Sequence, residues 1–185
     1  MRTFAVCMTE PKKSIFQRAS EWGVPFGLYL GVAAIASIFA DKMPVLSLVF
    51  WLMILGVPFL VYYFQRRKFI EDDGFTEHAG LWMMGIMLFI LGGMLASLIA
   101  YLVLQYIRPS FMYEQAQAVI EAYDKVPQMK DSEVLRVIKR MVDQRLMPAP
   151  IEVVFNAYWF IAFGGSLLSA ITAIVARRTI NKNHQ

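Results

Sequence analysis

Four long stretches without ionisable side chains constrain this chain more than any other feature of its sequence. They run from 22 to 40, 43 to 64, 81 to 104 and 153 to 176. Each has roughly 19–24 residues, and a helix needs about 20 to cross the hydrocarbon core of a bilayer. The stretches are apolar on every side, whereas a helix at the surface of a soluble protein keeps one polar face. We therefore predict an all-α integral membrane bundle of four transmembrane helices.

The composition excludes several other classes of protein. Hydrophobic residues make up 58% of the chain and charged residues 17%, against about 45–50% and about 25% in a soluble domain. This argues against a cytosolic enzyme and against a disordered chain. A disulfide scaffold is excluded because Cys7 is the only cysteine. The net charge of +4 comes from Lys and Arg at the span ends, where they orient the chain and meet anionic lipid, so nucleic acid is not an expected partner.

The distribution of Lys and Arg predicts the orientation in the membrane. If the spans alternate, ten Lys and Arg residues lie on the side of the two termini, close to the span ends. The other side carries eight, and seven acidic residues accompany them in the long segment between the third and fourth spans. We therefore expect a bacterial inner membrane protein with cytoplasmic tails at 1–21 and 177–185. Residues 1–21 are too polar for the apolar core of a signal peptide.

The segment 105–152 between the last two spans is predicted to form an extracytoplasmic amphipathic helical hairpin, since a structureless loop of this length is uncommon. Ser110 is a plausible N-cap of the first helix, and Pro148 ends the second. The apolar stripe consists of Met112, Ala116, Val119, Tyr123 and Val126 in the first helix and Leu135, Ile138, Met141, Val142 and Leu146 in the second. The stripe either packs within the hairpin and on the span ends, or serves as a docking platform for a partner.

Small residues recur inside the spans at a spacing that lets helix backbones approach closely. Gly23, Gly27 and Gly31 form a tandem series in the first span. The corresponding residues of the third and fourth spans are Gly92, Gly93, Gly164, Gly165 and Ser169. These residues indicate either helix packing within one bundle or contact with a second membrane protein. Pro58 should kink the second span and free a backbone carbonyl.

The sequence contains few side chains that could take part in ion transport, metal binding or catalysis. Pumps, ion-coupled transporters and voltage sensors usually need ionisable groups inside their spans, and these spans have none. His78 and His184 have no second ligand at metal spacing. The run from Glu71 to Asp73 reads either as a divalent-ion site or, more simply, as a solvated turn. We therefore expect no catalytic residues, no metal and no cofactor.

The order of features resembles a known family. Gly23 to Gly27 opens the first span, Arg66 to Phe69 leads to Asp73-Gly74-Phe75, Tyr106 to Pro109 closes the third helix, and Arg177-Arg178 follows a last span rich in Gly and Ser. Nearly the whole chain is similar to the four-span membrane proteins of Bacteroidetes in domain-of-unknown-function family 4199. The resemblance implies no catalytic residues. Genes of that family often lie beside a polyprenyl-phosphate glycosyltransferase, so the resemblance also implies a candidate partner.

The leading functional hypothesis is a non-catalytic accessory subunit that binds and positions a partner protein in the cell envelope, with a polyprenyl-phosphate glycosyltransferase as the implied candidate. Gly23, Gly27 and Gly31 would form a lateral contact, and the hairpin stripe an outer contact. A cytoplasmic basic contact would consist of Arg66, Arg67 and Lys68. The alternative is a small oligomeric carrier or channel for a neutral or lipid-linked solute, with Pro58 as its hinge. An enzyme using Glu71 to Asp73 is the third hypothesis.

Overall fold

A computed structural model describes residues 15–72, 76–125, 133–144 and 146–181 of the chain. All regular structure in these ranges is helical, and four helices are long and apolar enough to cross a membrane. The helices are α1 (Ile15–Phe39), α2 (Pro44–Glu71), α3 (His78–Leu102), the π-helix η1 (Val103–Ile107), α4 (Phe111–Asp124), α5 (Glu133–Asp143) and α6 (Pro150–Asn181). The prediction of an all-α, four-span architecture is confirmed.

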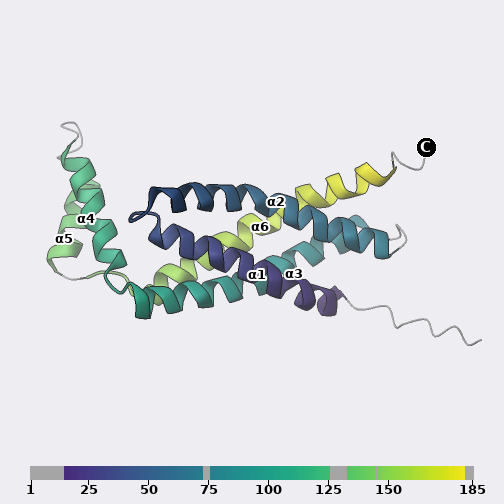
Figure 1. Ribbon diagram of the computed structural model, residues 1–185, viewed down its shortest axis with the longest axis horizontal. Coiled ribbons are helices and arrows are strands. Elements are labelled where there is room, and N and C mark those ends of the chain that lie inside the picture. The colour runs from purple at the N-terminus through teal and green to yellow at the C-terminus, as the bar shows by residue number, and fades with distance from the viewer. Residues whose placement is uncertain (1–14, 73–75, 126–132, 145, 182–185) are drawn as a thin grey trace, which may run out of the picture.

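The four long helices run side by side as an elongated bundle (Figure 1). Helix α3 packs along both α1 and α6, and α2 packs against α1 and α6 at the periphery. The centre is closed by Phe26 of α1, Val61 of α2, and Leu88 and Phe89 of α3. The rings of Phe26 and Phe89 meet edge to face with their centroids 5.1 Å apart, a geometry that aromatic pairs prefer. In the apolar window of α2 only 11% of the residues are buried, so most of this helix faces lipid.

The helices extend beyond the charge-free stretches of the sequence. Helix α1 begins at Ile15 and contains Pro25, and α2 continues past Phe64 to Glu71. Helix α6 begins at Pro150, the first helical position, where a missing backbone N–H costs nothing. At the turn between α1 and α2 the helices stop within the charge-free runs, since α1 ends at Phe39 and α2 begins at Pro44.

Helix α2 continues through Pro58, and a polar contact lies nearby. The hydroxyl of Tyr29 in α1 donates a hydrogen bond of 2.6 Å to the carbonyl oxygen of Met53. Gly56 makes room for this contact, because a methyl group on Gly56 would collide with the Tyr29 hydroxyl. The contact holds α1 against the middle of α2.

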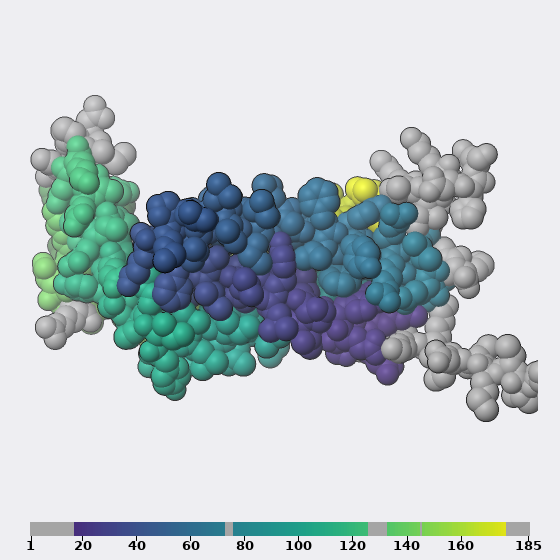
Figure 2. Space-filling model, in the orientation of Figure 1, coloured from purple at the N-terminus to yellow at the C-terminus, as the bar shows by residue number. Residues whose placement is uncertain are grey.

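Helices α4 and α5 lie side by side across one end of the bundle (Figure 1). The beginning of α1 and the end of α6 lie at the opposite end, so α4 and α5 are separated from both by the length of the bundle (Figures 1 and 2). We refer to the two helices as the α4–α5 pair. The connection between them falls in residues 126–132, outside the described residues, and so does the expected stripe position Val126.

Candidate functional site

The tandem glycines of α1 lie against α3. A methyl group on Gly27 would stand 2.9 Å from the carbonyl oxygen of Gly92 and 2.9 Å from Cβ of Leu95. One on Gly31 would stand 2.6 Å from Cδ1 of Ile99, and one on Gly23 would stand 3.2 Å from Cβ of Leu91. Of the two alternatives for these glycines, the structure places them in packing within the bundle. The surface that a lateral partner would need at Gly23, Gly27 and Gly31 is occupied by α3.

The other small residues divide between the interior and the surface. Gly92 accommodates the ring of Phe26, Gly165 faces the ring of Phe89, and Gly93 lies beside Tyr158. Gly164 is exposed, and a methyl group there would meet no atom within 4 Å. Gly164 is therefore the one member of the predicted set that points away from the bundle.

A buried polar cluster joins α2, α3 and α6. Nε2 of Gln65 donates to Oγ of Ser169 at 3.0 Å and to the Ser169 carbonyl at 3.1 Å. The Ser169 hydroxyl in turn donates to the Trp82 carbonyl at 3.1 Å. Gly85 permits this approach, because Ser169 Cβ would lie only 2.7 Å from an added methyl group. Ser169 was expected as a small packing residue and also proves to be a hydrogen-bonding one. Gln65 was missed, because it follows the end of the charge-free stretch.

The three basic residues expected at the cytoplasmic surface have different environments. Arg66 and Arg67 are exposed, but Lys68 is only 3% exposed. Nζ of Lys68 donates a hydrogen bond of 3.1 Å to the Gly80 carbonyl near the start of α3. Arg67 pairs with Glu71 at 3.0 Å and lies over the ring of Trp22. Helix continuation past the charge-free stretch turns Lys68 inward, so it does not form a joint surface with its two neighbours.

The acidic residues near this end are engaged by cations. Arg18, which is 7% exposed, lies 3.4 Å from Glu71 and 3.5 Å from Asp72. The Thr76 hydroxyl donates to Asp72 at 2.6 Å. Asp73 lies outside the described residues, and within the described ranges no three His, Cys, Asp or Glu side chains gather as metal ligands do. The observed contacts join α1 to the end of α2.

Arg108 links the bundle to the α4–α5 pair. It follows η1, is 5% exposed, and donates hydrogen bonds to the carbonyl oxygen of Ile38 in α1 and to the carboxylate of Glu114 in α4. Its guanidinium lies over the rings of Phe39 and Phe111, 5.6 Å and 5.1 Å from their centroids. The wide turn of a π-helix is uncommon and often marks a functional position. Here it directs Arg108 back into the bundle.

Glu114 is held in its charged form at this junction. The Ser110 hydroxyl donates a hydrogen bond of 2.6 Å to the Glu114 carboxylate. This bond, followed by the one from Arg108, lowers the pKa of Glu114 below its usual value. Ser110 does precede α4, but its side chain bonds Glu114 and makes no cap with the helix backbone.

The apolar stripe of the α4–α5 pair is partly buried and partly exposed. Leu135 is 1% exposed, whereas Ile138 and Val142 are half-buried. In α4, Met112 and Tyr123 are half-buried and Val119 lies at the surface. Sequence reasoning missed two exposed residues beside the stripe, Val134 and Val137, although they complete a wide apolar arc on α5. The exposed apolar side chains of α5 are Val134 at 56%, Val137 at 44% and Met141 at 42%.

A hollow lies next to this surface. It has a volume of about 640 Å³ and is lined by Tyr113 of α4, Val142 and Asp143 of α5, and Met147. The hollow borders the apolar stripe at Val142.

The fold and these surfaces define a multi-pass α-helical membrane protein with a helical pair at one end of its bundle. Residues 22–178 match the family described as protein of unknown function DUF4199, and the chain belongs to that family. No curated protein and no solved structure matches the chain.

Proposed function

We propose that this protein is a non-catalytic membrane subunit that holds a partner protein through its α4–α5 pair. The observation that carries the proposal is the exposed apolar arc of Val134, Val137 and Met141 on α5. A helix outside the hydrocarbon layer normally buries such an arc in a core. Here Leu135 is buried and Ile138 and Val142 are half-buried, but Val134, Val137 and Met141 remain exposed.

The chemistry of α5 suits recognition by a groove. The opposite side of the helix carries Arg136, Lys139 and Arg140, all exposed, although Lys139 also pairs with Asp124 of α4. The helix is therefore divided into an apolar and a basic side. Partners that bind amphipathic helices take the apolar side into a hydrophobic groove and meet the charges at its rim. We therefore propose a partner with an apolar groove and an acidic rim.

The attachment of the pair to the bundle supports the same role. Arg108 bonds both the end of α1 and the start of α4, and Lys139 of α5 pairs with Asp124 of α4 at 3.1 Å. A surface already ordered before binding loses less conformational freedom when the partner arrives. The bundle then serves as the membrane support for the surface.

The orientation and the partner are part of the proposal. With both termini in the cytoplasm of a bacterial inner membrane, the α4–α5 pair is extracytoplasmic, as the Lys and Arg distribution predicts. The gene neighbourhood implied by the family resemblance makes a polyprenyl-phosphate glycosyltransferase the first partner to test. Its catalytic residues would then supply the chemistry, and this chain would position it.

The test is affinity purification of the tagged protein in mild detergent, with identification of co-purifying proteins by mass spectrometry. Val137→Glu and Met141→Glu place a charge on the exposed arc, and Gln117→Glu places the same charge on an exposed polar position of α4. We expect one stoichiometric membrane enzyme with the native chain and with Gln117→Glu, and its loss with either arc variant. A lone homo-oligomer, or equal recovery from all variants, would contradict the proposal.

A further inference from the structure

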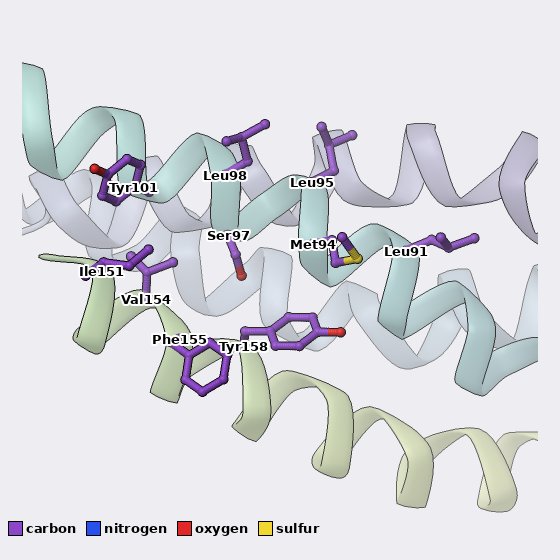
Figure 3. Close-up of a pocket in the computed structure, with 10 residues that line it drawn as sticks. All are labelled: Leu91, Met94, Leu95, Ser97, Leu98, Tyr101, Ile151, Val154, Phe155 and Tyr158. Atoms are coloured by element: carbon purple, nitrogen blue, oxygen red, sulfur yellow. The ribbon is translucent and has the colours of Figure 1, made fainter.

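An apolar groove runs along α3 and α6 in the half of the bundle next to the α4–α5 pair (Figure 3). Its volume is about 720 Å³. The ten lining residues are Leu91, Met94, Leu95, Ser97, Leu98 and Tyr101 of α3 and Ile151, Val154, Phe155 and Tyr158 of α6. Val154 is buried at the floor, while Met94, Leu98 and Phe155 are exposed at 58%, 55% and 57%. Because both helices cross the membrane, the groove opens toward lipid.

Three hydroxyl groups stand among these apolar side chains. Ser97, Tyr101 and Tyr158 are half-buried, and Figure 3 shows all three along the groove. None has a hydrogen-bond partner in the part of the chain that the structure describes. A hydroxyl without a partner is costly in hydrocarbon, where no water replaces the missing bond. The groove therefore favours an apolar ligand that brings a hydrogen-bond acceptor with it.

The dimensions argue against a second copy of the chain as the occupant. A stable protein interface engages about 20–30 residues on each side, and the groove offers the ten named above. Membrane helices pair through small residues that bring their backbones together. Gly92 and Ala96 of α3 are buried inside the bundle, and Ser97 is the one small residue among the ten that line the groove. The volume instead falls in the range of about 300–1,000 Å³ that is typical of sites for small molecules.

We propose that the α3–α6 groove binds a hydrocarbon chain of a membrane phospholipid. Tyr101 lies three residues before the end of the charge-free stretch 81–104, about 5 Å deeper at 1.5 Å per residue. That depth is close to the boundary between the interfacial layer and the hydrocarbon core. The ester carbonyl of the lipid accepts a hydrogen bond from Tyr101, and its chain extends along Leu98 and Met94 toward Leu91. This site is on the bundle and is independent of the partner-binding role of the α4–α5 pair.

The test uses the full chain in vesicles of phosphatidylethanolamine and phosphatidylglycerol that contain a phospholipid with a photoreactive diazirine in one acyl chain. After irradiation, labelled residues are located by mass spectrometry. We expect Met94, Leu98 and Phe155 to be labelled at least several-fold more than Leu48 and Leu52, which are exposed on α2 at 67% each. Uniform labelling of all lipid-facing residues would overturn the proposal, and this comparison needs no variant.

Two variants sharpen the result. Ser97→Phe fills the groove, and Leu52→Phe adds an aromatic ring on the lipid-facing side of α2. Labelling of Leu98 should fall several-fold with Ser97→Phe and stay unchanged with Leu52→Phe. Unchanged labelling in a folded Ser97→Phe protein would contradict the assignment.

A disulfide test addresses the second copy directly. Leu98→Cys is introduced into a Cys7→Ser background and oxidised in the same vesicles. We expect monomers. Efficient disulfide formation between two copies would show that the groove is a dimer interface, and the lipid proposal would fail.

Discussion

Nε2 of Gln65 in α2 donates a hydrogen bond of 3.0 Å to Oγ of Ser169 in α6, and both side chains are at most 1% exposed. Because the Ser169 hydroxyl also bonds the Trp82 carbonyl of α3, three helices meet at this one pair. Hydrogen bonds between membrane helices contribute about 0.6 kcal/mol on average and up to about 1.7 kcal/mol. We expect Ser169→Ala to lower the free energy of unfolding by about 1 kcal/mol in a mixed-micelle denaturation series.

Ser166→Ala provides the matched control, since it removes a half-buried hydroxyl one turn earlier on the same helix. A double-mutant cycle with Gln65→Leu isolates the pair from effects on each residue alone. If the two substitutions lower the stability additively, the Gln65–Ser169 bond has no measurable coupling energy and the interpretation is wrong.

Replacing glycine by alanine should affect the free energy of unfolding differently at Gly27 and at Gly164. Gly27→Ala inserts a methyl group 2.9 Å from the Gly92 carbonyl oxygen, and overpacking of this kind costs about 1–3 kcal/mol. Gly164→Ala meets no atom within 4 Å, so only the better helix propensity of alanine remains, which favours the helix by up to about 1 kcal/mol. The same unfolding measurement should show destabilisation at Gly27 and none at Gly164. Equal effects at both positions would refute the packing of α1 on α3.

The sequence was sufficient to predict the four spans, because a charge-free stretch of bilayer length is rare outside membrane-spanning helices. It was insufficient to place the helix ends, because the spacing of residues along a helix does not change where the helix passes from the hydrocarbon layer into the interfacial layer. For this reason Arg18 and Lys68, read as surface charges, prove to be buried on extended helices. The buried position of Gln65 was not predicted for the same reason.

Which side of each helix packs against which neighbour also could not be predicted without the three-dimensional arrangement. The spacing of Gly23, Gly27 and Gly31 predicts a close approach but does not name the helix that approaches. Arg108 was counted as a loop charge, because its inward direction depends on the π-helix that precedes it. On α5 the sequence predicted the stripe from Leu135 to Val142 but not the exposed Val134 and Val137, because which apolar residues stay exposed depends on how α4 and α5 are turned against each other.

The junction at Glu114 predicts a response to pH. Its pKa in the folded protein lies below the usual value near 4.5, mainly because of the hydrogen bond from Ser110 and then that from Arg108. A carboxyl group with a lowered folded-state pKa stabilises the fold above its unfolded pKa, and this contribution is lost as the pH falls through the folded-state value. We therefore expect α4 to loosen from the bundle only below about pH 4.5.

The measurement is a carbon-13 NMR titration of the Glu114 carboxyl group, accompanied by limited digestion with pepsin at the acidic end. Ser110→Ala should raise the pKa of Glu114 toward its usual value, and Glu114→Gln should make the digestion of α4 independent of pH. A Glu114 carboxyl that titrates identically with and without the Ser110 hydroxyl would contradict the assignment of the cause.

Arg108 is expected to control the order of the α4–α5 pair. Its guanidinium donates hydrogen bonds to both Ile38 and Glu114 and lies over the rings of Phe39 and Phe111. Hydrogen bonds that involve a charged group contribute about 1.5–3 kcal/mol each. Arg108→Gln should therefore accelerate amide hydrogen exchange through α4, with little change in the central part of α3.

Arg108→Lys should restore only part of the protection, because an ammonium group lacks the planar fork that bonds two acceptors at once. Lys125→Gln, at the exposed far end of α4, removes one positive charge as a control and should leave exchange unchanged. Unaltered protection of α4 in Arg108→Gln would mean that other contacts, such as the hydrogen bond from Gln115 of α4 to Asp41, hold the pair to the bundle without Arg108.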